Sequence, residues 1–216
     1  MPHIWIIALA TVLLSVVLFA EKGENRRLLV PSKGILSLLF VLAALVEPRP
    51  LPGYQVPLLW GLVFCLLGDI CLALPQRKAF LLGLFSFLIG HAFYVVAFLA
   101  AGKAGLWTLL GALATCGVSG WIYRWLSPHL GRMRGPVVAY ILLITAMVAC
   151  AFSVLERGDL LLEARVIVLA GAICFYLSDI FVARDRFVRN EFLNRAAGLP
   201  LYYAAQFLLA FSTALV

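Results

Sequence analysis

Two aspartates lie inside long apolar stretches, Asp69 in residues 61–73 (GLVFCLLGDICLA) and Asp179 in residues 171–183 (GAICFYLSDIFVA). Each acid precedes the end of its stretch by four or five residues, a depth of roughly 6–9 Å if the stretch is a membrane-spanning helix. A carboxylate at that depth is costly unless it faces protein or water, and such residues are functional candidates. Two neighbouring buried carboxyl groups can share one proton, so that one acts as an acid while the other stays charged. The pattern predicts acid–base chemistry.

The two stretches resemble each other at an offset of 110 residues. The identical pairs are Gly61 and Gly171, Leu67 and Leu177, Asp69 and Asp179, Ile70 and Ile180, and Ala73 and Ala183. If this is an internal repeat, it predicts two parallel halves of four helices, with equivalent acids facing each other across a pseudo-twofold axis. The alternative is that each aspartate only satisfies a hydrogen bond between helices.

Other polar residues are expected near the depth of the two acids. They are Lys33, Tyr140, Tyr202, Tyr203 and Gln206, with His91 and Tyr94 deeper in their stretch. One cavity that opens toward the cytoplasmic leaflet would account for this layer. Two alternatives stay open, because Lys33 could extend to the membrane interface and His91 could be a packing residue.

The composition indicates that the helices which must position these residues lie in a membrane. Of the 216 residues, 64% are hydrophobic and 12% charged, which excludes an ordinary soluble domain. A spanning helix needs roughly 20 apolar residues, and eight stretches approach this length: 4–20, 30–46, 56–74, 79–100, 105–126, 136–155, 161–183 and 197–216. The second and eighth are short or interrupted, so six or seven spans remain an alternative. We expect an all-α, polytopic transmembrane helical bundle that forms a single integral membrane domain over residues 1–216.

The distribution of basic residues predicts the orientation of the bundle. The odd-numbered connections between the predicted spans contain 13 Lys and Arg residues and the even-numbered ones contain four. Because basic residues favour the cytoplasmic side, we expect both termini outside the cytoplasm. The net charge of +7 therefore indicates membrane topology and not nucleic-acid binding. Short connections and the absence of targeting signals favour a bacterial inner membrane.

The order of short motifs resembles the YhhN family of lysoplasmalogenases. The matching motifs are Lys33 at the start of a span, Gly68-Asp69, GHAFY with His91 and Tyr94, Tyr140, Ser178-Asp179, and YYAAQ from Tyr202 to Gln206. One departure is Gly34 after Lys33, where the family tends to have proline. The motifs keep their order over nearly the whole chain.

This resemblance implies a membrane hydrolase that cleaves the vinyl ether bond of a lysoplasmalogen into a fatty aldehyde and glycerophosphoethanolamine or glycerophosphocholine. It implies no cofactor or metal, and the expected partners are the lysophospholipid substrate and membrane lipids, with no protein partner indicated. Asp69 and Asp179 are the expected catalytic pair. The expected substrate-binding or supporting residues are Lys33, His91, Tyr94, Tyr140, Ser178, Tyr202, Tyr203 and Gln206.

Two other functions are compatible with buried polar residues in a membrane protein. A proton-coupled transporter of small solutes or lipids also uses parallel repeats with buried acids. A zinc-dependent membrane amidase needs several histidine ligands, but His3 and His129 lie outside the interior of the predicted spans.

Overall fold

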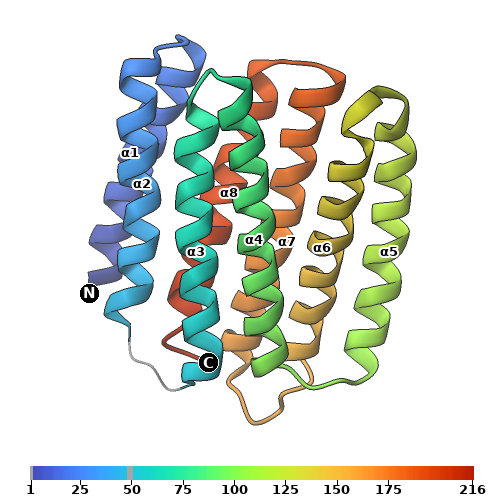
Figure 1. Cartoon of the computed structure of the whole chain (residues 1–216). Helices are drawn as coiled ribbons and strands as arrows, with labels where there is room; N and C mark the ends of the chain where they lie inside the picture. The colour runs from blue at the N-terminus through green and yellow to red at the C-terminus, as the bar shows by residue number, and fades with distance from the viewer. Residues whose placement is uncertain (1, 48–50) are drawn as a thin grey trace.

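The computed structural model describes residues 2–47 and 51–216, and the described residues form an all-helical bundle (Figure 1). The eight α-helices are α1 (Pro2–Lys22), α2 (Arg26–Val46), α3 (Pro52–Ala73), α4 (Arg77–Ala101), α5 (Leu106–Leu126), α6 (Arg134–Val154), α7 (Leu162–Ala183) and α8 (Phe192–Ser212). Short 3-10 helices at Ser127–His129 and Gly131–Met133 connect α5 to α6, and a π-helix at Arg184–Val188 continues α7. The predicted spans agree with these helices within a few residues, except that α8 begins five residues earlier than the predicted span.

Seven of the described helices, α1 to α7, are long and apolar enough to cross a membrane. The helix α8 is as long as α2, but it buries the polar side chains of Asn194, Tyr202 and Gln206 within the bundle. The prediction of a polytopic membrane bundle is confirmed, and the protein is a multi-pass membrane protein.

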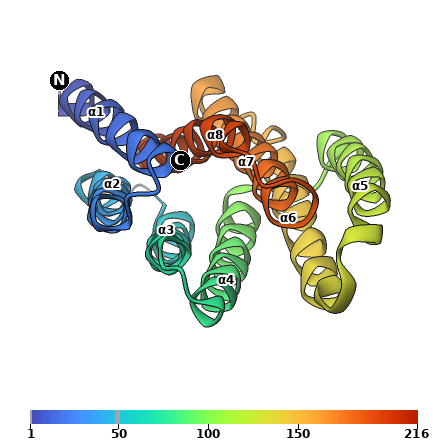
Figure 2. The same ribbon diagram turned by 90° about the horizontal axis from the view of Figure 1, so that it is seen from above.

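Six helices form a ring around the centre of the bundle (Figure 2). In order around the ring, α2 contacts α3, α3 contacts α4, α4 contacts α6, α6 contacts α7, α7 contacts α8, and α8 contacts α2. The other two helices lie outside this ring, α1 against α2 and α8, and α5 against α6.

The ring consists of two parallel halves, as the repeat predicts. A shift of 110 residues moves the bounds of α3, Pro52–Ala73, onto those of α7, Leu162–Ala183. The same shift relates the packing of α3 on α4 to that of α7 on α8, and the contact of α4 with α6 to that of α8 with α2. The halves therefore meet at two equivalent contacts, and α3 and α7 occupy equivalent places.

Two glycines allow α3 and α4 to pack closely. A Cβ atom at Gly61 would overlap the ring of Tyr94, and one at Gly68 would overlap the ring of Phe87. Small residues allow helices to approach in lipid, where packing and hydrogen bonds drive their association. Gly61 and Gly68 thus face α4, and Asp69 on the same helix is buried in protein.

Alternating helix directions place the connections α1–α2, α3–α4, α5–α6 and α7–α8 at one end of the bundle, opposite the two termini (Figure 1). These are the connections that contain most of the basic residues of the sequence. We call this end the basic end.

Candidate active site

A cavity of about 470 Å³ lies within the ring and extends to the basic end. Its lining includes Glu21, Gln76 and Asp185 at that end. Six of the predicted site residues also line it: Lys33, Asp69, Tyr140, Ser178, Asp179 and Tyr202. The structure therefore brings both aspartates to one cavity, although they are far apart in the sequence.

Asp69 is held by donors from α2 and α8. Its side chain is only 2% exposed. The hydroxyls of Ser37 and Tyr202 each donate to Oδ2 at 2.6 Å, and Nζ of Lys33 lies 3.9 Å from Oδ1. Two hydroxyl donors and an ammonium group are partners that stabilise a charged carboxylate.

Asp179 is held by residues from α6 and α4, the helices equivalent to α2 and α8. Its side chain is 16% exposed and faces the cavity. The hydroxyl of Tyr140 donates to Oδ2 at 2.7 Å, and Nε2 of His91 lies 3.5 Å from the same oxygen. Among the described residues, Asp179 thus accepts a hydrogen bond from one hydroxyl group, whereas Asp69 accepts from two hydroxyl groups and also lies near a lysine ammonium group.

The hydrogen bonds of His91 indicate where its proton lies. Nδ1 lies 2.6 Å from the carbonyl oxygen of Phe87, and because a carbonyl only accepts, Nδ1 carries the proton. In the neutral ring, Nε2 therefore presents a lone pair, and it has no hydrogen-bond partner within residues 2–47 and 51–216. A lone pair and a charged carboxylate repel each other, so this contact is favourable when a proton resides on Nε2 or on Asp179.

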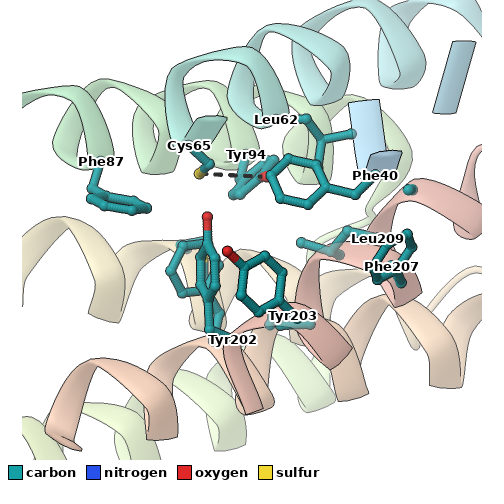
Figure 3. Close-up of a cluster of buried hydrophobic side chains, with 14 of the residues drawn as sticks. Phe40, Leu62, Cys65, Phe87, Tyr94, Tyr202, Tyr203, Phe207 and Leu209 are labelled. Carbon is teal, nitrogen blue, oxygen red and sulfur yellow. Dashed lines mark hydrogen bonds between the residues drawn. The ribbon is translucent and has the colours of Figure 1, made fainter. Parts of the chain in front are cut away.

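The remaining predicted residues lie behind the cavity. The Tyr203 hydroxyl lies 3.3 Å from Oγ of Ser37. Tyr94 donates to Oε1 of Gln206 at 2.7 Å, and neither of these two residues lines the cavity. Figure 3 shows the Tyr202 and Tyr203 rings projecting from α8 toward the helices that carry Cys65 and Phe87. The expected layer therefore divides into a cavity wall and a deeper Tyr94–Gln206 pair.

Lys33 is buried and does not extend to the membrane interface. It is 5% exposed, and its ammonium group lies beside the Asp69 carboxyl group in the interior of the bundle. Sequence reasoning missed Ser37, which follows Lys33 by one helical turn and lies on the same face of α2. That spacing was the signal that could have identified it.

Within the described parts of the chain, no group of three or more His, Cys, Asp or Glu side chains is placed to hold a metal ion. Around the two aspartates the cavity offers carboxyl, hydroxyl and ammonium groups, and toward the basic end it offers guanidinium and amide groups. These groups can transfer protons and stabilise charge.

The chain is similar in sequence to known proteins over most of its length. A model of the YhhN family matches residues 28–213. A protein from Mycobacterium tuberculosis named lysoplasmalogenase is 31% identical over 176 residues, which cover 78% of this chain and 63% of that protein. A Bos taurus protein named lysoplasmalogenase TMEM86A is 32% identical over 154 residues, 70% of this chain and 62% of that protein. A Mus musculus protein named lysoplasmalogenase TMEM86B is 34% identical over 164 residues, 74% of this chain and 65% of that protein.

The matched region therefore spans less than two thirds of the length of each of these relatives. No solved structure matches this chain.

Proposed function

This chain belongs to the YhhN family, and we propose that it hydrolyses the vinyl ether bond of a lysoplasmalogen with Asp69 and Asp179 as the catalytic pair. The products are a fatty aldehyde and a glycerophospho-base. The relatives named lysoplasmalogenase support the reaction. The observation that carries the proposal is that the two carboxyl groups line a single cavity, with different partners.

Asp179 is the proposed general acid. Hydrolysis of a vinyl ether begins with proton transfer to the alkene carbon that is not bonded to oxygen. The other alkene carbon and the ether oxygen then share the positive charge as an oxocarbenium ion. Asp179 faces the cavity, and its contact with His91 favours a proton on this pair. A positioned acid of this kind typically accelerates a reaction by about 10²–10⁴-fold.

Asp69 is the proposed stabiliser of the cation. Lys33, Ser37 and Tyr202 are the partners that would favour its charged form before the reaction starts. A fixed carboxylate requires little reorganisation when a positive charge develops beside it. The unequal environments therefore match the two unequal tasks, as in other enzymes that use two carboxyl groups.

Water completes the reaction, and the protons balance. Water adds to the cationic carbon and returns one proton to Asp179, so that a hemiacetal forms. The hemiacetal then loses its hydroxyl proton, the bond from carbon to the glycerol oxygen breaks, and that oxygen takes up a proton. The net change consumes one water. Tyr140 and Tyr202, whose hydroxyls lie at the aspartates, would orient the water and the glycerol hydroxyl.

The shape of a lysoplasmalogen is compatible with the position of the cavity. We propose that the single alkenyl chain lies between the helices and that the head group stays at the basic end, on the cytoplasmic side. The ether linkage would then lie just below the interface, at the depth of the two aspartates.

The test uses purified protein in detergent with a lysoplasmalogen and, separately, with the matching acyl lysophospholipid. We expect aldehyde from the first and no fatty acid from the second, with EDTA without effect. Fatty acid release would indicate an esterase, and loss of activity in EDTA would indicate metal chemistry. Solute flux in proteoliposomes without hydrolysis would favour the transporter.

A further inference from the structure

Three arginines line the cavity at the basic end, and they differ in their partners. They are Arg26 at the start of α2, Arg186 in the π-helix after α7, and Arg195 in α8. Arg195 lies between two acids, 3.6 Å from Glu21 and 3.2 Å from Asp185. Its charge is therefore balanced within the protein.

Arg26 and Arg186 have no acidic partner within residues 2–47 and 51–216. Nη1 of Arg26 donates to the carbonyl oxygen of Ala73 at 2.9 Å, and the Arg186 guanidinium lies 4.0 Å from the centre of the Phe80 ring. These contacts orient each guanidinium without neutralising it. The cavity entrance thus carries two positive charges that are not paired with carboxylates.

Lys33 is not available for the same purpose. It is buried beside Asp69, inside the cavity and away from the entrance, and its charge is needed there. An anion that binds at the entrance would therefore meet Arg26 and Arg186 first. Arginine suits this task because its planar group of donors matches phosphate geometry.

We propose that Arg26 and Arg186 bind the phosphate group of the substrate; this inference rests on the proposed function. The distances from the aspartates to the two arginines along the helix axes agree with the distance from the double bond to the phosphorus in a lysoplasmalogen. Ala73, which anchors Arg26, lies about one turn beyond Asp69, and Arg186 lies about two turns beyond Asp179, or roughly 6 and 11 Å along the helix axes. From the alkenyl carbon that accepts the proton to the phosphorus there are seven bonds, roughly 9 Å when extended. A phosphate between the two arginines would thus leave the double bond beside the aspartates.

The experiment compares Arg26→Gln/Arg186→Gln with the wild type on two substrates, a lysoplasmalogen and the matching 1-alkenylglycerol, which lacks the phosphate. For the lysoplasmalogen we expect KM to rise about tenfold or more, because charge-assisted hydrogen bonds are lost, while kcat stays within about twofold. For the alkenylglycerol we expect both constants to match those of the wild type. Unchanged turnover of this second substrate also shows that the variant is folded.

The control is Arg27→Gln/Arg132→Gln, which removes the same charge from the basic end at exposed arginines that do not line the cavity. The inference is overturned if this control raises KM for the lysoplasmalogen as much as the cavity variant does. It is also overturned if the cavity variant leaves that KM unchanged, or if it impairs both substrates equally, as expected for arginines that hold bulk membrane phospholipid. Failure of the wild type to release aldehyde would contradict the proposed function instead.

Discussion

Asp69 and Asp179 occupy equivalent places in the two halves of the ring, yet their surroundings differ. Asp69 is nearly inaccessible and is surrounded by two hydroxyl donors and a lysine. Asp179 opens onto the cavity and has one hydroxyl donor and a histidine lone pair. Asp69 is contacted from α2 and α8, and Asp179 is contacted from the equivalent helices α6 and α4. The two halves therefore share the arrangement of helices but not the side chains around the acid.

Residues at equivalent positions show how the difference arises. At the offset of 110, Lys33 and Ser37 of α2 correspond to Leu143 and Met147 of α6. The second half therefore offers Asp179 neither the cation nor the serine hydroxyl that Asp69 receives. A repeat can thus place two carboxyl groups alike and still give them different neighbours through a few substitutions around them.

The largest expected effect comes from Asp179→Asn. An amide cannot supply the proton that the alkenyl carbon requires, so we expect kcat for aldehyde release to fall by about 10³–10⁴-fold. Asp159→Asn is the control, because Asp159 is an exposed aspartate at the opposite end of the bundle, and it should stay within about twofold of wild type. Activity of Asp179→Asn near that of the wild type would remove the distinction between the two acids.

Asp69→Asn should have the next largest effect on turnover. Loss of the charge beside the developing cation should lower kcat by about 10²–10³-fold. It also leaves Lys33 buried without its partner, which should cost about 3–5 kcal/mol of stability. Thermal unfolding in detergent measures this cost, and Lys33→Met/Asp69→Asn should regain most of it. A single variant as stable as wild type would mean that Lys33 and Asp69 are not coupled.

His91 tests whether the histidine lone pair gives Asp179 its role. His91→Leu removes the acceptor beside Asp179, and we expect kcat to fall about tenfold with little change in KM. His91→Gln retains a side-chain acceptor and should lose less than about threefold. Equal losses in the two variants would indicate that the imidazole only fills space.

The smallest effects are expected from glycine substitutions that compare the helix packing of the two halves. A methyl group at Gly61 meets the Tyr94 ring, whereas one at the equivalent Gly171 meets the flexible end of Leu209. We therefore expect Gly61→Ala to destabilise the protein by about 1–3 kcal/mol and Gly171→Ala to cost less. Denaturation in detergent ranks the two variants, and the reverse order would contradict the close packing of α3 on α4.

The sequence predicted the helices better than the contacts between side chains. Long apolar stretches locate spans because the bilayer requires them, and the repeat around Asp69 and Asp179 predicted the parallel halves. Helix rotation within the ring depends on packing between distant segments, which no local pattern encodes. The pairing of Tyr94 with Gln206, away from the cavity, was therefore not predictable. His91 was expected as a supporting residue, but its particular partner, Asp179, was not predicted.

The double variant Asp69→Asn/Asp179→Asn tests most directly whether the two carboxyl groups act on one reaction. Groups that act as a unit give losses that do not multiply. We predict that kcat for aldehyde release from lysoplasmalogen is about the same in the double variant as in Asp179→Asn alone. If the loss in the double variant equals the product of the two single losses, the aspartates act independently and the proposed pair is contradicted.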